Sequence, residues 1–357
     1  GQFGTRIQGG KDSASPRYIH TELNNIVPLI FHSDDFDVLD YLDDDGIKIE
    51  PFHYIPIIPM ILVNGTVGIG TGFSTNIPCY NPKDIIRNLR LLMDHEDMMN
   101  MSPWYQGFKG TNIDGVSKGV YKKLTNTKVE VTELPIGYWT EDFKNHLESY
   151  MEKNPKVLRD YESHYTEKDV KFVLHFHSKE VCDTYLEFDE DKNRTKFDTE
   201  FKMQTTRPLN TSNMHLYTEN GNIKKYADVL EIMREFYDVR LEYYVKRKVY
   251  KIKKIKKELK FLDARIKFIE DIITEKLCVF NNKKQNIIDY LTANGFPLYE
   301  NSFDFLTRMP IHNLTYEKKQ ELLNECDAKH LMLDNIESEE EKDTWRNDLL
   351  ALEKKLT

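Results

Sequence analysis

The clearest pattern along the chain is an apolar repeat between residues 252 and 273. Apolar side chains recur there at alternating spacings of three and four, at Ile252, Ile255, Leu259, Leu262, Ile266, Ile269 and Ile273. This spacing places them on one stripe of an α-helix, as in the seam of a coiled coil. Leu241 and Val245 continue the stripe upstream, and Lys248 interrupts it. We therefore predict a long helix over residues 224–276.

A second apolar repeat predicts a partner for this helix. A helical pattern resumes at Thr315, and further apolar residues step by four, three and four, at Trp345, Leu349, Leu352 and Leu356. The segment between the repeats has a globular pattern, with a helix stop at Asn294-Gly295 and apolar residues at Phe296, Phe303, Phe305 and Met309. Because a long seam needs a partner helix, we predict an antiparallel coiled-coil arm. It comprises an outgoing helix (224–276), a small helical domain (277–314) and a returning helix (315–357).

Shorter elements are expected before the arm. Helical spacing of apolar residues predicts helices over residues 21–30 and 82–93, and the run 47–49 reads as a strand. Residues 53–63 are almost all apolar, but Pro56 and Pro59 limit them to an edge or irregular strand. Short strands at 129–131, 171–176 and 215–217 alternate with helices near 140–152 and 178–186, and Asn220-Gly221 marks a turn. The whole chain therefore reads as an α+β multidomain protein.

Two sequence features invite a metal hypothesis. Asp43-Asp44-Asp45 is a cluster of carboxylates, and His175 and His177 alternate on a predicted strand. A solvated turn before the strand at 47–49 explains the first feature better than a metal site does. No third ligand accompanies the two histidines, so packing or solvent contact explains them better than metal binding. We predict no metal site in this chain.

Residues 64–72 form a glycine-rich stretch, Asn64-Gly65-Thr66-Val67-Gly68-Ile69-Gly70-Thr71-Gly72. It partly fits a nucleotide-binding GxGxxG pattern, but neither a βαβ frame nor an acidic partner accompanies it. A loop that exposes Ile69 is the better description. An exposed isoleucine can act as a wedge that unstacks and kinks DNA, whereas a core isoleucine under a tight loop is the alternative.

Composition narrows the classes of protein. The formal net charge of −9 argues against a uniformly basic nucleic-acid coat, although one positive face would suffice for DNA binding. The cations at 246–260 are most simply a solvated helix face.

The four cysteines form no CxxC pair, which favours free thiols. We find no membrane-length apolar run and no secretory signal, so we predict no membrane partner. The chain lacks an initiator Met, which led us to expect a piece of a longer polypeptide.

Candidate chemistry concentrates in residues 9–19. Two glycines and Lys11 precede Ser15 and Pro16, and Arg17 and Tyr18 follow. Pro16 restricts Ser15 to an extended conformation, so the Arg-Tyr pair has little freedom. A phenol beside a guanidinium is a plausible nucleophile for phosphorus, because the cation favours phenolate and neutralises phosphate charge. The simpler alternative is a surface cation beside a half-buried ring.

Several motifs in order carry a resemblance to a known family. The chain resembles the DNA-cleaving subunit of type IIA DNA topoisomerases, in the eukaryotic and large-virus form. The motifs are Gly1-Gln2-Phe3-Gly4-Thr5-Arg6, Gly10-Lys11-Asp12-Ser13-Ala14-Ser15-Pro16-Arg17-Tyr18, Tyr54-Ile55-Pro56-Ile57-Ile58-Pro59-Met60, Asn64-Gly65, Gly68-Ile69-Gly70-Thr71-Gly72, Phe108-Lys109-Gly110-Thr111, Glu133-Leu134-Pro135, Trp139-Thr140, Lys224-Lys225-Tyr226, Met309-Pro310 and Leu314-Thr315.

The resemblance implies both architecture and sites. It implies the end of a winged-helix domain over residues 1–50, an α/β tower domain over 51–223, and an exit gate at the tip of the arm that holds a homodimer together. Tyr18 would form a transient 5′-phosphotyrosyl link with double-stranded DNA, and Arg17 would hold the phosphate. Ile69 would intercalate. Further expected DNA contacts are Lys11, Arg6, Ser15 and Thr71.

The same resemblance sets limits on this chain. Mg²⁺ and ATP would serve the whole enzyme, and the ATPase and metal-binding parts would belong to the same polypeptide outside this segment. The location would be the nucleus for a cellular source, or the host cytoplasm or a viral replication site for a viral one. The rival hypotheses are a non-catalytic DNA-binding coiled-coil scaffold and a tyrosine recombinase or type I enzyme.

Overall fold

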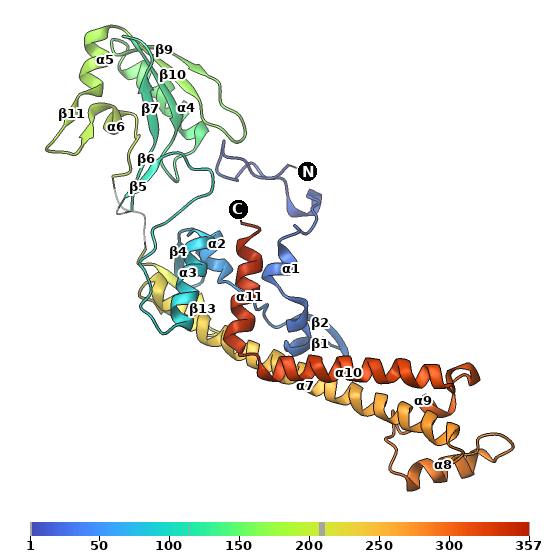
Figure 1. Ribbon diagram of the computed structural model, residues 1–357. Helices are drawn as coiled ribbons and strands as arrows, with labels where there is room; N and C mark the ends of the chain where they lie inside the picture. The colour runs from blue at the N-terminus through green and yellow to red at the C-terminus, as the bar shows by residue number, and fades with distance from the viewer. Residues whose placement is uncertain (1, 114, 207–210, 357) are drawn as a thin grey trace. The chain divides into compact units, whose positions relative to one another are not determined.

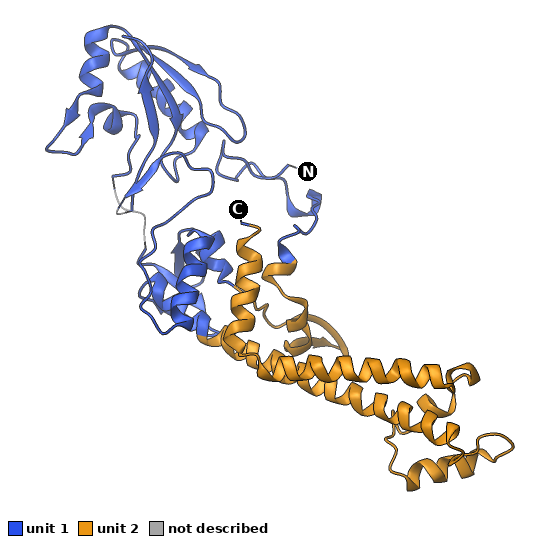
Figure 2. Ribbon diagram, in the orientation of Figure 1, with its two compact units in different colours: residues 1–27, 58–237, 356–357 blue, residues 28–57, 238–355 orange. Residues whose placement is uncertain are grey.

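The computed structural model describes residues 2–113, 115–206 and 211–356 (Figure 1). Gly1, at the start of the first motif, therefore lies outside the described residues. The chain divides into two compact units (Figure 2). Unit 1 contains residues 1–27, 58–237 and 356–357, and unit 2 contains residues 28–57 and 238–355. Helices and small sheets occur together, which confirms the predicted α+β class.

Unit 1 contains a four-stranded antiparallel sheet in the order β7-β8-β10-β9. Its strands are β7 (Val120–Lys123), β8 (Lys128–Glu133), β9 (Leu158–Ser163) and β10 (Phe172–Phe176), and its helices are α4 (Thr140–Lys153), α5 (Lys179–Leu186) and α6 (Lys196–Glu200). The core joins sheet residues such as Val131 and Leu174 to helix residues such as Phe143 and Phe197. The strands predicted at 129–131 and 171–176 and the helices predicted near 140–152 and 178–186 are confirmed.

The rest of unit 1 consists mainly of small hairpins and helices. They are η1 (Pro16–Tyr18), α2 (Met60–Asn64), α3 (Pro82–Met93), and the pairs β3 (Thr66–Ile69) with β4 (Ser74–Ile77), β5 (Thr111–Ile113) with β6 (Val116–Lys118), β11 (Phe188–Asp189) with β12 (Arg194–Thr195), and β13 (Met214–Tyr217) with β14 (Ile223–Tyr226). The strand predicted within residues 53–63 is wrong. Pro59 instead stands at the N-cap of α2, where a proline costs no hydrogen bond.

The helix predicted over residues 21–30 is also largely wrong. Only α1 (Val27–Ile30) is helical, and Leu23 is exposed. Pro28 explains the difference, because it has no amide hydrogen to donate to a preceding turn, so a helix can begin near it but cannot continue through it. The Asn24 side chain accepts a bond from the Ile26 backbone, which closes a turn there instead.

Unit 2 contains most of the long arm. Its elements are η2 (Ser33–Val38), β1 (Tyr41–Asp44), β2 (Ile47–Pro51), α8 (Lys284–Ala293), α9 (Asp304–Thr307), η3 (Ile311–Asn313), α10 (Tyr316–Ser338) and α11 (Glu341–Glu353), with most of α7 (Val229–Ile273). α7 and α10 run side by side in opposite directions (Figure 1). Seam residues including Leu259, Leu262 and Ile269 pack against Leu322, Cys326 and Leu333. The predicted coiled-coil arm is therefore present, although residues 224–226 belong to β14 and not to the outgoing helix.

The returning segment is two helices, not one. α10 ends at Ser338, Glu339 and Glu340 are extended, and α11 then turns away from α7 (Figure 1). Lys248 supports the break, because its ammonium donates to the Glu339 carbonyl over 2.7 Å and pairs with Glu341. The lysine that interrupts the seam in sequence thus marks the place where the partner helix ends.

Upstream of Lys248 the buried face of α7 is polar and aromatic. Val245 is exposed, contrary to the predicted continuation of the seam, whereas Arg240, Tyr244 and Arg247 are buried. The two guanidinium groups lie 4.1 and 4.7 Å from the centre of the Tyr244 ring, and Trp345 of α11 stacks on the same ring. Arg247 was expected on a solvated face, so that part of the prediction is wrong.

The small domain at the arm tip has its own core. Phe296 and Phe303 are buried with Phe268 of α7 and with Leu291 and Leu306. Phe296 and Phe303, which the sequence showed as apolar residues of this segment, are therefore part of this core. Other apolar side chains of the segment are exposed: Phe280, Leu298, Tyr299 and Ile311, followed by Tyr316 at the start of α10.

The residues that raised the metal hypotheses have hydrogen-bond partners within the protein. Asp43 belongs to strand β1 opposite Lys48, and its side chain accepts a hydrogen bond from the Gly46 amide in the turn that follows. His175 donates its Nε2–H to the carboxylate of Glu162 on the neighbouring strand over 2.7 Å. Hydrogen bonds from His164 and then His175 lower the pKa of Glu162 to about 2. Across the described ranges no group of three or more His, Cys, Asp or Glu side chains is placed to hold a metal ion.

Candidate DNA-contact site

The segment before Tyr18 is a loop closed by its own hydrogen bonds. The Gly10 amide donates to the Thr5 carbonyl and the Ala14 amide to the Gln2 carbonyl, both over 2.9 Å. Asp12 accepts from the Thr5 hydroxyl and the Thr5 amide, and these bonds lower the pKa of its carboxyl group. A Cβ at Gly4 would lie 2.5 Å from the Gly10 Cα, so the close approach of the two strands of the loop requires glycine.

Three sequence motifs meet where this loop docks on the sheet of unit 1. Glu133, only 1% exposed, receives the Arg6 guanidinium in an ion pair and the Lys109 amide in a hydrogen bond. The Glu141 amide donates to the Ile7 carbonyl over 3.0 Å. A Cβ on Gly9, whose φ is +62°, would collide with the Trp139 ring. The spacing between these motifs gave no sign that they belong to one contact.

Arg6 has a different environment from the one expected for a DNA contact. Its guanidinium is committed to a buried carboxylate, and its backbone amide donates to the Glu167 carbonyl over 3.1 Å. An uncompensated Glu133 would be costly, so Arg6 stabilises the loop. Its role as a DNA contact stays a prediction from sequence that this arrangement does not favour.

Arg17 and Tyr18 lie in η1, a single 3-10 turn. Ser15 is extended, as predicted from Pro16, and its carbonyl accepts the Tyr18 amide over 2.9 Å. The Tyr18 residue is 62% exposed, and the Arg17 Cζ lies 5.8 Å from the centre of its ring. Lys11, Ser15 and Arg17 are also exposed. The structure thus presents the phenol to a large ligand with a guanidinium next to it.

Ile69 ends strand β3 at the tip of a hairpin. It is 94% exposed, which excludes the core alternative, and the segment is a strand rather than the expected loop. Thr71 is exposed in the turn between Gly70 and Phe73, which the Gly70 amide closes over 2.8 Å. A Cβ on Gly70 would lie 2.7 Å from the Phe73 ring, so a side chain at position 70 would displace that ring.

The hairpin is held from its other strand. The Asn76 amide donates to the Asn213 carbonyl over 2.8 Å, and the Asn213 side chain donates to the Ser74 hydroxyl. Phe73 packs edge-on against Tyr217 of β13. These contacts hold strand β4 and the Phe73 side of the turn, whereas Ile69 on strand β3 stays exposed and can contact a ligand.

The sequence analysis missed Val67, which is 81% exposed two residues before Ile69. Side chains two apart on a strand point to the same face, so Val67 and Ile69 form one apolar edge. That period-two rule would have found Val67 once the segment was recognised as a strand.

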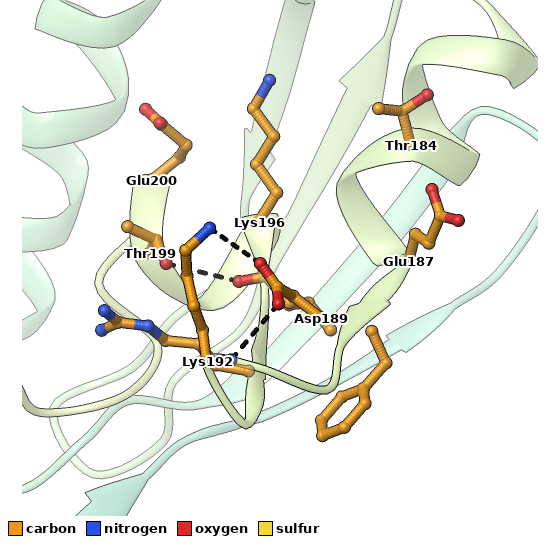
Figure 3. A pocket seen from close by; sticks show the side chains of 10 residues that line it. Thr184, Glu187, Asp189, Lys192, Lys196, Thr199 and Glu200 are labelled. Carbon is orange, nitrogen blue, oxygen red and sulfur yellow. Dashed lines mark hydrogen bonds and ion pairs between the residues drawn. The ribbon is translucent and has the colours of Figure 1, made fainter.

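A pocket in unit 1 is unrelated to these residues. It measures about 620 Å³ and is lined by residues of 184–200 (Figure 3). Figure 3 shows Asp189 and Lys192 joined by an ion pair, at 2.7 Å. Tyr18, Arg17 and Ile69 instead stand on open surface, which suits a macromolecular ligand better than a small one.

The described residues do not fit Mg²⁺ or ATP. Besides the lack of a metal-ligand cluster, the glycine-rich residues 68–72 form part of a hairpin and not the strand-to-helix turn that cradles phosphates. No reaction step in this chain is therefore assigned to a bound metal or nucleotide.

Comparisons with known proteins agree with the motifs. The family model for DNA gyrase/topoisomerase IV matches residues 1–352. The chain belongs to this family. It is 37% identical to DNA topoisomerase 2 of Arabidopsis thaliana, over 100% of this chain and 27% of that protein. It is 34% identical to human DNA topoisomerase 2-alpha, over 98% of this chain and 25% of that protein.

A solved structure extends the similarity to the fold. The Plasmodium falciparum topoisomerase II DNA-binding, cleavage and re-ligation domain matches with a TM-score of 0.85 and 34% identity. The match covers 99% of this chain and 51% of that one. The topoisomerase resemblance is confirmed, and the chain spans about a quarter of the length of the curated relatives. None of the helices in the described ranges is both long and apolar enough to cross a membrane.

Proposed function

We propose that this chain supplies the DNA breakage and reunion residues of a type II DNA topoisomerase. The observation that carries the proposal is the exposed Tyr18 phenol beside Arg17, in a chain whose relatives are topoisomerases. The Tyr18 Oη attacks a backbone phosphorus of double-stranded DNA. A phosphotyrosyl bond forms, the P–O bond to the 3′ oxygen breaks, and that oxygen leaves as a hydroxyl after protonation. The reverse reaction rejoins the strand without a further energy source.

Arg17 and its neighbours have supporting roles in this proposal. A guanidinium can hold two phosphate oxygens and stabilise the charge that develops during transfer. Lys11 and Ser15 are exposed on the same loop and would contact the adjoining backbone. Mg²⁺ and ATP would act in other parts of the enzyme, because the described residues fit neither. A non-catalytic coiled-coil scaffold would not require the Arg-Tyr turn and is not favoured.

Ile69 is proposed to bend the bound duplex. An apolar side chain pushed between base pairs unstacks them and kinks the helix. The hairpin offers Ile69 almost fully exposed, with Thr71 at the tip and Val67 on the same edge. Exposure of this apolar edge to water is unfavourable, and insertion between two stacked base pairs would bury it.

Replacing Ile69 by alanine should reduce DNA bending without harming the fold. The isoleucine is exposed, so its loss should change the free energy of unfolding by less than about 0.5 kcal/mol. The bend is measured by energy transfer between dyes at the two ends of a duplex. Ile47→Ala, at another exposed hairpin isoleucine, is the control and should leave the bend unchanged. An unaltered bend in Ile69→Ala, or a large loss of stability, would contradict the wedge.

We further propose that the tip of the arm, residues 277–314, forms a homodimer contact. The seam residues of α7 are already occupied by α10, so they are not available to a second chain. Exposed apolar residues remain at the tip, among them Phe280, Leu298 and Ile311. A two-fold contact through this segment would bury them and could still open.

Ile311→Asp should therefore weaken self-association. A buried isoleucine contributes about 1.5–3 kcal/mol, so a rise of at least about tenfold in the dimer dissociation constant is expected. Sedimentation velocity over a concentration series measures it. Leu331→Asp, an exposed leucine on α10, is the matched control and should have no effect. Equal dimerisation of Ile311→Asp and the parent would place the contact elsewhere.

For a cellular source we propose the nucleus as the location, and for a viral one the host cytoplasm or replication site.

A further inference from the structure

The cations of α7 between residues 246 and 260 fall into two groups. Six of them have acidic partners. These pairs are Lys246 with Glu242, Arg247 with Asp348, Lys248 with Glu341, Lys251 with Asp34, Lys254 with Asp37, and Lys256 with Glu337. These six cations therefore form ion pairs within unit 2.

Three lysines differ from this pattern. Lys253, Lys257 and Lys260 are exposed and make no ion pair with any of the described residues. With Ile252 and Leu259 in the seam, these three positions fall on the opposite side of the helix. At about 1.5 Å of rise per residue they span roughly 10 Å. We call Lys253, Lys257 and Lys260 the lysine stripe.

The stripe occupies a bounded window on the helix. One turn upstream on the same face lies Tyr250, and one turn downstream Ala264 is buried by the domain at the arm tip. Hydrogen bonds and ion pairs occupy the nearest carboxylates on α7, since Asp263 accepts from Cys326 and Glu258 pairs with Lys329. Nothing in the described part of unit 2 therefore neutralises the stripe.

The spacing of the three lysines lowers the stability of the helix on its own. Lys253 and Lys257 are four residues apart and Lys257 and Lys260 three apart, spacings at which like charges repel. Helix stability therefore does not account for the stripe, whereas an external anion would relieve the repulsion.

We propose that the lysine stripe binds the phosphate backbone of duplex DNA, as a contact additional to the Tyr18 turn and the Ile69 hairpin. The inference rests on the proposed function and deepens it. Lysines on flexible stems follow phosphates without reading sequence, so the contact is expected to be indifferent to base order. An acidic protein partner is less well matched, because lysine is depleted in protein interfaces and the stripe has no buried apolar anchor.

The experiment compares two triple variants of the whole chain. K253Q/K257Q/K260Q removes the stripe, and K156Q/K168Q/K179Q removes three other exposed lysines that have no ion pair among the described residues and lie outside the proposed dimer contact. Both lose three positive charges, so general attraction to DNA changes equally. A fluorescent duplex of arbitrary sequence is titrated at several KCl concentrations. The plot of log affinity against log salt should become shallower by about 2–3 for the stripe variant only, as expected for three lost phosphate contacts.

Further measurements separate the alternatives. The stripe variant should melt at the same or a higher temperature, because like-charge repulsion is removed, and K253R/K257R/K260R should retain the parent slope. Equal slopes in both glutamine triples and the parent would overturn the stripe. The proposal would also be overturned if K253Q/K257Q/K260Q lost binding to a polyglutamate peptide but bound the duplex as the parent does. A parent chain that binds no duplex at any salt concentration would overturn the DNA role of the whole chain as well. Loss of DNA cleavage on Tyr18 substitution is independent of all these outcomes.

Discussion

Tyr18→Phe should abolish DNA cleavage while DNA binding persists. The substitution removes only the phenol oxygen, which is the atom that would attack phosphorus, and the exposed ring makes few contacts that could be lost. We expect no covalent protein–DNA complex in a denaturing gel, assayed in the full-length enzyme of which this segment is proposed to form part. Duplex affinity, measured by fluorescence anisotropy, should stay within about twofold, because a surface change of this size alters binding by less than about 0.5 kcal/mol.

A matched tyrosine separates this effect from a general one. Tyr54 is exposed to a similar degree, and Tyr54→Phe should cleave normally. In the parent protein the DNA adduct should map to Tyr18 by mass spectrometry of the tryptic peptides. A residual covalent complex in Tyr18→Phe, or an adduct on another tyrosine, would contradict the assignment of the nucleophile.

Arg240→Met should destabilise unit 2 by about 3–5 kcal/mol, the cost typical of breaking a buried ion pair. Arg240 is fully buried, and its guanidinium donates to Asp35 over 2.8 Å. The nearest other cation, Arg247, lies 3.6 Å from that carboxylate and is mainly engaged by Asp348. Removal of Arg240 therefore leaves the negative charge of the buried Asp35 carboxylate only weakly neutralised by Arg247. Urea unfolding, followed by circular dichroism, measures the loss.

Two companion variants test the explanation. Lys254→Met breaks an exposed pair with Asp37 on the same helix and should cost no more than about 1 kcal/mol. Asp35→Asn combined with Arg240→Met removes the uncompensated charge and should recover part of the stability. If Arg240→Met proved no more harmful than Lys254→Met, the buried pair would not hold this part of unit 2 together.

Local patterns in the sequence determined the elements whose cause is itself local. The three-four repeat needs only one apolar stripe on one helix, so α7 and its pairing with a returning helix followed from it. Pro16 restricted Ser15 to an extended conformation and presented Arg17 and Tyr18 in one turn. The ordered motifs carried the family, because their residues stand together in the sequence itself.

Contacts between distant residues were decided only by the tertiary structure. Arg6 reads as a free cation until the fold places Glu133 beside it, 127 residues away. Arg247 and Lys253 look alike in a basic run, yet one is buried with Asp348 and the other has no partner within the described chain. The reason is physical: burial and ion pairing depend on which segments meet in space, and spacing along the chain records only the neighbours within a helix or strand.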